Sequence, residues 1–555
     1  MLPLRTFLFK IIKMKKLKLG SIAIALACAA PSFAGGLLTN TNQNVAFNRM
    51  MSREASIGID GVYYNPAGVV FMGDGHHLSI NWQLAYQTRT INNDYSLFTN
   101  NVDNPTTPRE FKGKAFAPVI PSFQYAYNKN NWSFQVNFAL NGGGGKCEFD
   151  NGLGSFEKIV SETAMAACGL ARVVDGSMQN VLGNPNLQMF SSDQYFGTAG
   201  KYSYNSYMRG RQYYYGLSLG VARKFNEHFS AAVGVRGIYA QANYYGYVKD
   251  IKVGNMPLYQ VLDPTKENSA DIELSCDQSG IGFTPIIGID YKTGRWNFSA
   301  KYEFKTRLRL KNSSVNKAPS IGNLSDNLSK SIVGGLASQF QQMGMTPEMA
   351  LATAETKTNA ILGDAKVVGT MGALKTQFDK ALDEAIGEYE DGKKIAGDIP
   401  AYLTLGAGYS PVDAVRINVG FHWFDDKNAT SYNERNKKLK HGTLEYNAGV
   451  EVDVCKKLTL STGWQSTNYG LPTEDLNTED SQRYMDDKSF VTSSNSVAFG
   501  GVYHISKKMD LNVAYFHTFY QHQKTTENVK ATQQTYSSDY TRNNNVFAVG
   551  LDINF

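Results

Sequence analysis

The chain has 555 residues, of which 42% are hydrophobic and 19% are charged, and its formal net charge at pH 7 is +6. Residues 1–34 carry six basic groups and no acidic group, so the rest of the chain is formally neutral. Because no global basic surface and no basic-aromatic module remain, the sequence excludes a nucleic-acid-binding protein.

The first 34 residues have the pattern of a secretory signal peptide. A basic region that ends at Lys18 precedes the apolar stretch 19–30, and Ser32-Phe33-Ala34 is a small-x-small cleavage site. We therefore expect cleavage near Ala34 and a mature chain that begins at Gly35.

Two features of this leader stay open. Met14 opens a more ordinary signal peptide than Met1 does, so either residue can be the true start. An alternative interpretation makes Cys28 a lipidated N-terminus, but Ala25 stands where lipoprotein signals usually carry Leu.

Residues 35–77 lack sustained alternation and precede the first predicted strand. They contain a short predicted helix at 42–52 and the stretch "GVYYNPAGVV" at 61–70. Pro66 fixes its own backbone angle and removes a donor, and Asn65 readily forms an Asx turn, so this stretch predicts a compact turn and not a spanning strand.

The remainder of the chain repeats a period of two, which is typical of strands with one apolar face. In "VRINVGFHWF", 415–424, every second side chain is apolar. Segments of this kind predict fourteen strands, at 78–91, 115–128, 131–141, 211–225, 228–248, 272–291, 295–312, 398–410, 412–427, 440–455, 456–468, 489–505, 509–524 and 541–555.

The connections between these strands alternate in length. "NKN", "FNE", "KTG" and "SKK" are tight turns, whereas the long connections are 92–114, 142–210, 249–271, 313–397, 469–488 and 525–540. An even strand number with short turns at one end and long loops at the other predicts an all-β transmembrane barrel of fourteen antiparallel strands, residues 78–555, in the outer membrane of a Gram-negative cell. A large soluble β protein is the alternative.

The positions of the aromatic residues also support the barrel. Aromatic residues fall on the outward faces, several at strand ends where an interfacial girdle lies: Trp132, Trp296, Trp423, Trp464, Tyr291, Tyr302 and Tyr409.

In the insertion 313–397, Thr346-Pro347 predicts a helix start, and Leu374, Phe378, Leu382 and Ile386 recur at helical spacing. We expect such helices over the external mouth, where a purely protective role is an equal alternative.

The turn at Asn65, Pro66, Ala67 and Gly68 carries a family resemblance. Small or acidic residues, an aromatic residue and this tetrapeptide, about ten residues before the first strand, resemble the hatch of the long-chain fatty acid transporter family (FadL/TodX type), which also has fourteen strands. "PSFQYAY", 121–127, resembles the second strand of that family. Because residues 62–72 are apolar, we expect 35–77 to lie inside the barrel as a plug.

The resemblance implies a monomer that passes hydrophobic small molecules, such as fatty acids, without energy coupling or a cofactor. It implies a hatch at the periplasmic side, a sideways exit at a kink in the third strand, and a place near the ligand for Leu37 and Leu38. No Pro marks such a kink in strand 131–141. Gly142–Gly145 is either a flexible exit from that strand or a plain loop start.

Inward-facing cations are the candidate ligand-binding residues. The alternation in 295–312 turns Lys301, Lys305, Arg307 and Arg309 toward the lumen, where Arg236 and Arg416 join them. Such a patch between apolar walls suits a carboxylate head with a long tail. Alternatively, these cations pair with inward acidic residues, Glu303, Glu445, Glu451 and Asp453.

No motif supports chemistry. "GLSLG", 216–220, lies in an alternating strand and not at a strand-to-helix turn, and the histidines have no zinc-site spacing. We therefore expect no catalytic residue, no metal and no enzyme activity. Cys147 and Cys168 share one connection, so either a disulfide or two free thiols is open. An adhesin that acts through its loops, or an outer-membrane lipid hydrolase, remains the alternative function.

Overall fold

The computed structural model describes residues 41–319, 323–472, 484–529 and 532–555. One antiparallel sheet closes on itself, because β1 (Gly75–Asp94) pairs with both β2 (Arg109–Lys129) and β18 (Gln534–Asn554). The other strands follow in chain order: β3 (Trp132–Phe149), β4 (Tyr202–Lys224), β5 (Phe229–Val253), β6 (Met256–Pro257), β7 (Ile272–Thr293), β8 (Trp296–Glu303), β9 (Arg309–Ser314), β10 (Lys394–Ala396), β11 (Tyr402–Val412), β12 (Val415–Phe424), β13 (Leu444–Cys455), β14 (Leu458–Asn468), β15 (Ser494–Ser506), β16 (Met509–Tyr520) and β17 (Gln523–Val529).

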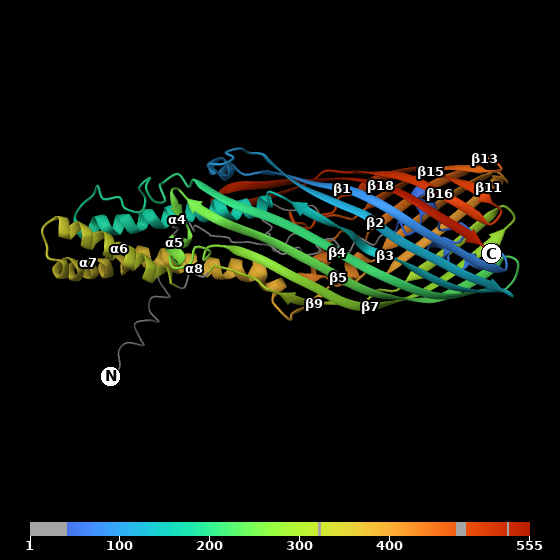
Figure 1. The fold of residues 1–555 in the computed structure, drawn as a ribbon, viewed down its shortest axis with the longest axis horizontal. Helices are drawn as coiled ribbons and strands as arrows, with labels where there is room; N and C mark the ends of the chain where they lie inside the picture. The colour runs from blue at the N-terminus through green and yellow to red at the C-terminus, as the bar shows by residue number, and fades with distance from the viewer. Residues whose placement is uncertain (1–40, 320–322, 473–483, 530–531) are drawn as a thin grey trace, which may run out of the picture.

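The barrel wall has fourteen strands, as the sequence predicts. Three of them are interrupted, since β8 and β9, β10 and β11, and β16 and β17 each follow one path along the wall. The two-residue β6 only extends the end of β5 as a short hairpin and is not a separate wall strand. The strands tilt steeply around the barrel, and the turns at the end that holds the C-terminus are short (Figure 1). All fourteen predicted segments contain an observed strand, with ends that differ by several residues.

The outer surface of the wall is apolar and the inner surface is polar. On β7, the side chains of Ile281, Phe283 and Ile287 are exposed. Thr284 and Asp290, which lie on the opposite face of the same strand, are buried. This distribution is the reverse of a soluble protein, and the wall is therefore built to lie in lipid. Of the helices in the described residues, none has the length and apolarity that a membrane crossing requires.

One strand departs from its predicted alternation. The pairing of β7 with β8 ends at Ile286 opposite Glu303, and the pairing with β9 starts at Ser279 opposite Lys311, one residue out of step. Pro285 has no N–H to donate between these points, so the ladder breaks beside it. A shift of one residue exchanges the two faces of a strand.

This shift corrects the prediction for three cations. Before the break, Lys301 is buried on the lumen side as predicted. After it, Leu308 and Leu310 are buried, and Lys305, Arg307 and Arg309 are exposed and do not face the lumen. The prediction is wrong for these three because it extends one alternation across the break.

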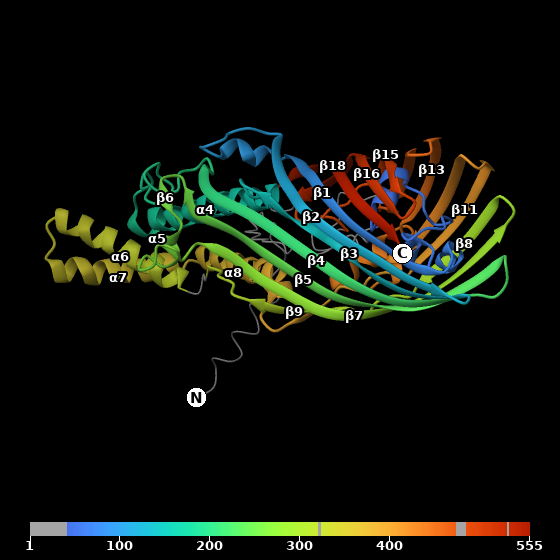
Figure 2. The same cartoon turned by 45° about the vertical axis from the view of Figure 1, so that its right-hand side comes forward.

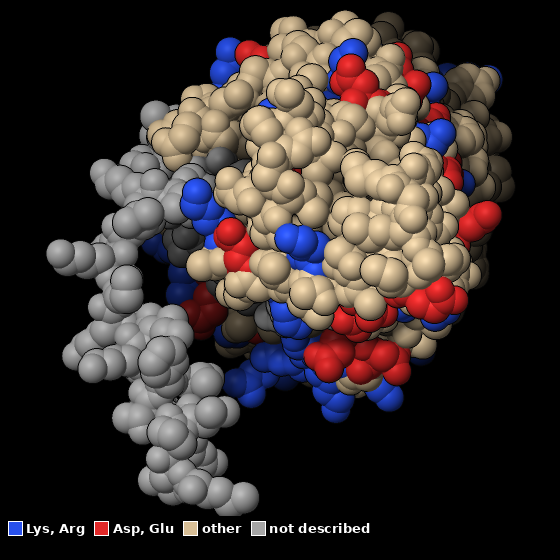
Figure 3. All heavy atoms as spheres, turned by 90° about the vertical axis from the view of Figure 1, so that its left-hand side faces the viewer, with Lys and Arg blue, Asp and Glu red and all other residues tan. Residues whose placement is uncertain are grey.

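Helices gather at the end of the barrel opposite the C-terminus (Figures 1 and 2). They are α4 (Gly154–Leu182), α5 (Tyr259–Leu262), α6 (Leu324–Gln342), α7 (Pro347–Leu362) and α8 (Ala365–Ile386), with short 3-10 turns η3 (Ser96–Asn100), η4 (Gly387–Tyr389), η5 (Asp426–Asn428) and η6 (Tyr432–Lys438). The predicted start of α7 is confirmed, because the Thr346 side chain accepts a hydrogen bond from the Met349 N–H. Seen end-on, this face carries both charge signs at its margin and few charges at its centre (Figure 3).

Several predicted loops are shorter than the sequence suggests. β3 continues to Phe149 and β4 begins at Tyr202, so the strands occupy both ends of the segment 142–210, and α4 fills much of the rest. The predicted loop 525–540 is largely a hairpin of β17 and β18. The strands therefore extend beyond the apolar belt and carry the helices on their ends.

The described residues before β1, 41–74, fold inside the barrel. They form α2 (Val45–Met50), α3 (Gly61–Tyr64) and the 3-10 helix η2 (Gly68–Met72), all largely buried (Figure 2). We call residues 41–74 the inner segment. Gly449 and Gly463 let it approach the wall, because a side chain at either position would overlap with the Met50 carbonyl oxygen.

Candidate functional site

Buried ion pairs fasten the inner segment to the wall. Glu451 on β13 accepts hydrogen bonds from Arg49 of α2 and from Arg416 of β12, the latter at 3.2 Å from Nε, and lies 3.4 Å from Arg53 Nη1. Arg53 also holds Asp60 within the inner segment, with Nε 2.7 Å from Oδ2. One wall carboxylate therefore links two guanidinium groups of the inner segment to one on the wall.

A second fastening point is centred on His422 of β12. Its Nε2 lies 2.6 Å from Glu54 Oε1 of the inner segment, and its Nδ1 lies 2.7 Å from Glu445 Oε2 of β13. A carboxylate can only accept, so both ring nitrogens donate and the imidazole carries a proton on each. The inner segment is thus held by a charged, fully buried bridge.

The charge on Glu54 predicts acid sensitivity. Burial by itself raises the pKa of Glu54, but the facing His422 charge and the hydrogen bonds from His422 and Ser52 outweigh it and lower that pKa below its ordinary value. A lowered carboxyl pKa stabilises the packed state above the ordinary value of about 4.3 and loses this contribution as the pH falls further.

We expect the wild-type protein to leak small ions increasingly as the pH falls below about 4. Glu54→Gln should leak more than wild type at pH 7 and change less with acid. Conductance of the purified protein in planar bilayers measures both. Glu227→Gln, an exposed change in the β4–β5 turn, is the matched control. Identical acid profiles of wild type and Glu54→Gln would exclude a role for this bridge.

The predicted turn is present between α3 and η2. The Asn65 side chain closes it by accepting from the Gly68 N–H at 3.1 Å, and its amide donates to Asp290 Oδ2 of β7 at 2.5 Å. The carbonyl oxygens of Pro66 and Ala67 accept hydrogen bonds from wall side chains, Gln135 Nε2 and Ser230 Oγ, each at 2.7 Å. The turn therefore serves as a docking point of the inner segment on three wall strands.

The remaining predicted binding cations are in ion pairs. Arg236 donates two hydrogen bonds to Glu303, at 2.6 and 2.9 Å, and Lys301 Nζ lies 2.8 Å from the same carboxylate. Arg416 pairs with Asp453 as well as Glu451. The alternative interpretation, in which inward charges compensate one another, is therefore the observed arrangement for these three.

The sequence also made predictions for two leucines and two cysteines. Leu37 and Leu38 lie outside the described residues. Cys147 and Cys168 are both buried free thiols, so the disulfide alternative is wrong.

A cavity of about 340 Å³ lies in the lumen of the barrel, and the inner segment forms part of its lining. Its lining includes Phe47 and Met51 of the inner segment, Phe516 of the wall and Phe490 from the connection before β15. Polar side chains, such as Gln212 and Arg542, converge on the same space. This combination of volume, apolar walls and few polar groups is typical of a small-molecule site.

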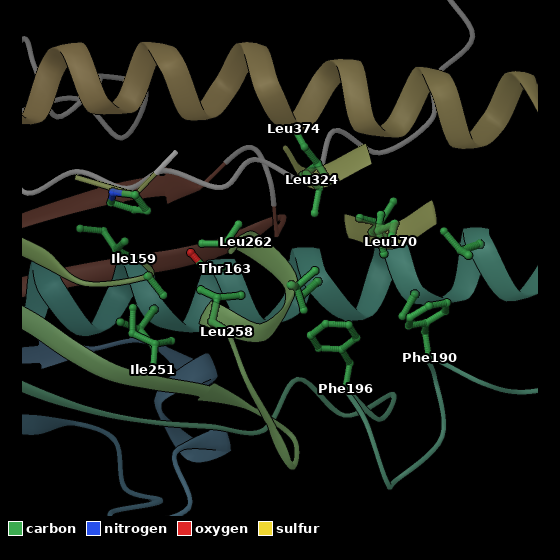
Figure 4. Close-up of a pocket in the computed structure, with 18 residues that line it drawn as sticks. Ile159, Thr163, Leu170, Phe190, Phe196, Ile251, Leu258, Leu262, Leu324 and Leu374 are labelled. Carbon is green, nitrogen blue, oxygen red and sulfur yellow. The ribbon is translucent and has the colours of Figure 1, made fainter. Parts of the chain in front are cut away.

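A second cavity lies among the helices at the end of the barrel opposite the C-terminus (Figure 4). It is lined by residues of α4, α5, α6 and α8, and Ile159, Leu262 and Leu374 point toward one another in it. Its volume of about 70 Å³ is well below the several hundred Å³ of ordinary ligand sites. We interpret it as the apolar contact that holds the helices together, and we take the lumen cavity as the candidate site.

The wall beside the lumen cavity is incompletely paired. In the described chain, residues 117–122 of β2 and 139–145 of β3 form no ladder with each other, although pairs flank them on both sides. Pro118 and Pro121 remove two donors from β2, and β3 is bulged against β4 on either side of Gly143. The open alternative for Gly142–Gly145 is therefore resolved: these glycines belong to the third strand.

Comparison with known proteins agrees with this architecture. No family model matches the sequence, and no curated protein matches it. The crystal structure of a Pseudomonas aeruginosa FadL homologue superposes with a TM-score of 0.54, covering 94% of this chain and 100% of that chain at 15% sequence identity. The chain has the FadL fold. The toluene transporters TodX of P. putida and TbuX of Ralstonia pickettii are 12% identical, with TM-scores of 0.47 and 0.45, and each comparison covers 90% of this chain and 94% of the other.

On this FadL fold, three cations line the lumen cavity that the sequence did not predict: Lys488, from the connection before β15, and two arginines. Arg89 on β1 and Arg542 on β18 lie directly opposite each other, and both line the lumen cavity. Each lies in a predicted strand, but strand alternation alone does not reveal that the first and last strands bring them together. Their proximity can be predicted only when the register in which β1 pairs with β18 is known.

Proposed function

We propose that the chain is an outer-membrane channel through which hydrophobic small molecules, long-chain fatty acids among them, pass by diffusion. One observation carries the proposal: the lumen cavity is lined by Ala117, Ile120, Gly143 and Gly145, the residues of the unpaired wall between β2 and β3. A molecule in the cavity is therefore beside a weak point of the wall. The FadL fold supports the same function without specifying the substrate.

In this proposal the inner segment is the hatch. It is fastened to the wall by Glu451, His422 and the turn at Asn65–Gly68. We expect it to close the straight path along the barrel axis. A sideways path for apolar molecules then coexists with a barrier to water and ions. We further propose that the protein acts as a monomer, carries out no chemical reaction, and matures by cleavage near Ala34.

Filling the cavity tests the function. Ala115 of β2 lines the cavity, and Phe116 beside it faces outward and is exposed. We expect Ala115→Trp to slow transfer of toluene or a fluorescent fatty acid into proteoliposomes about tenfold or more, because it occupies the space that the ligand needs. Phe116→Trp is the matched control and should transfer at the wild-type rate.

The outcome separates the candidate functions. Equal transfer by Ala115→Trp, Phe116→Trp and protein-free liposomes would overturn the channel and favour the adhesin, which needs no cavity. Mobility of unheated samples in SDS gels verifies that both variants form closed barrels.

A further inference from the structure

Arg89 and Arg542 place two positive charges at one point of the cavity wall. Arg89 Nε lies 3.2 Å from Gln87 Oε1, and Arg542 Nη2 lies 2.8 Å from the same oxygen. Two guanidinium groups thus converge on a neutral amide. Arg542 is only 8% exposed, and its Nε has no hydrogen-bond partner.

This pair differs from the other lumen cations. Arg49, Arg53, Arg236, Lys301 and Arg416 each have a carboxylate partner. Lys488, the third cation of the cavity lining, also has an interaction partner. Within the described ranges, no carboxylate forms an ion pair with Arg89 or Arg542, and the further contact of Arg542 is the Tyr520 ring, 5.0 Å away.

The one carboxylate among the cavity-lining residues does not supply the missing charge. Glu445 lines the cavity, but its oxygens accept from His422, Gln465 and Thr467. Two cations in a largely buried place, without compensation, are unfavourable unless an anion joins them. Among the described residues, these two charges therefore have neutral partners and no anionic one.

We propose that Arg89 and Arg542 together bind the head group of an amphiphile that carries two negative charges, such as an alkyl phosphate monoester. This inference rests on the proposed channel function and names a ligand class for it. A phosphate monoester has a charge close to −2 and three acceptor oxygens, which match two guanidinium forks. A single carboxylate leaves one of the two charges uncompensated.

The apolar part of the cavity accommodates the tail. Phe47 and Met51 of the inner segment belong to one buried cluster with Phe516 and Val546 of the wall, and all four line the cavity. The ligand therefore contacts charge at β1 and β18 and an apolar surface on the hatch. Its binding thus couples the head-group site to the inner segment.

The test compares ligands that differ in charge but share one tail. Full-length protein in nanodiscs is titrated at pH 8 with decyl phosphate, decyl sulfate, decanoate and inorganic phosphate by calorimetry. Decyl sulfate has the tetrahedral shape with a single charge, and inorganic phosphate has the charge without the tail. We expect decyl phosphate to bind at least about tenfold more tightly than each of the others.

Variants assign the effect to the two arginines. Arg89→Gln and Arg542→Gln should each lower the affinity for decyl phosphate about tenfold or more and reduce its preference over decyl sulfate to about one. Arg89→Lys keeps the charge and should retain part of the preference. Arg211→Gln, an exposed change on β4, is the matched control and should bind as wild type.

Defined outcomes overturn the inference. Equal affinity for decyl phosphate, decyl sulfate and decanoate in the wild type would exclude a site for a double charge. A phosphate preference that persists in both glutamine variants would place the site elsewhere, and tight binding of inorganic phosphate alone would show a site for the free ion. Toluene transfer by the wild-type protein tests the channel separately, because toluene has no head group.

Discussion

Glu451→Gln is expected to open the barrel to small hydrophilic solutes. The glutamine cannot compensate Arg49 and Arg53 of the inner segment, and Arg49 keeps only its neutral partners on the wall, such as Asn512 and Ser461. Loss of one partner from a buried ion pair costs about 3–5 kcal/mol. That amount is a large part of what a short segment can contribute to its own docking.

Conductance in planar bilayers and swelling of liposomes in small sugars measure this effect. Glu227→Gln is again the surface control, because Glu227 is exposed and pairs only with Lys224 across a turn. Barrel closure is verified by gel mobility without heating. If Glu451→Gln remains as tight as wild type, the ion pairs at Glu451 do not hold the hatch.

A disulfide across the unpaired wall is expected to stop transfer of hydrophobic molecules. A Cβ atom built on Gly145 lies 3.5 Å from the Cβ of Ala117, within the span of a disulfide. Oxidised Ala117→Cys/Gly145→Cys ties β2 to β3 and prevents the gap from widening. We expect transfer to fall about tenfold or more and to recover when the bond is reduced.

This experiment needs a background without the nearest thiol. Cys147 is a free thiol two residues from Gly145 and would compete for the new cysteine, so Cys147→Ser is introduced first. The two single cysteine variants in that background are the controls, and oxidant should not change their rate of transfer. Unchanged transfer by the fully cross-linked protein would place the exit at another part of the wall.

The strands and the barrel were open to prediction because their signal is local. An alternation such as that in 415–424 needs no knowledge of its partner strand. The turn at Asn65–Gly68 was equally predictable, since Pro66 and the Asn65 side chain specify it within four residues. Its docking partners, Asp290 and Ser230, come from distant strands and have no local signal.

The wrong predictions concern features that depend on a neighbouring strand and therefore have no local signal. Arg307 and Arg309 face outward because Pro285, on the neighbouring strand, interrupts the ladder; the sequence of 295–312 alone contains no trace of this shift. α4, by contrast, has a local signal of its own, since Leu170, Val174 and Met178 recur every four residues and are buried in the structure.

The closure of the barrel determines when the wall of the cavity is completed during assembly. β1 and β18 are the first and last strands of the barrel, yet they pair from His77 opposite Asn554 to Asp94 opposite Ser537. Contacts between such distant segments form late, because the loop that joins them is the longest in the chain. Arg89 and Arg542 therefore meet only when the last strand docks on the first. A bound anion would stabilise that final seam, so ligand should shift the midpoint of urea-induced unfolding of the assembled barrel upward.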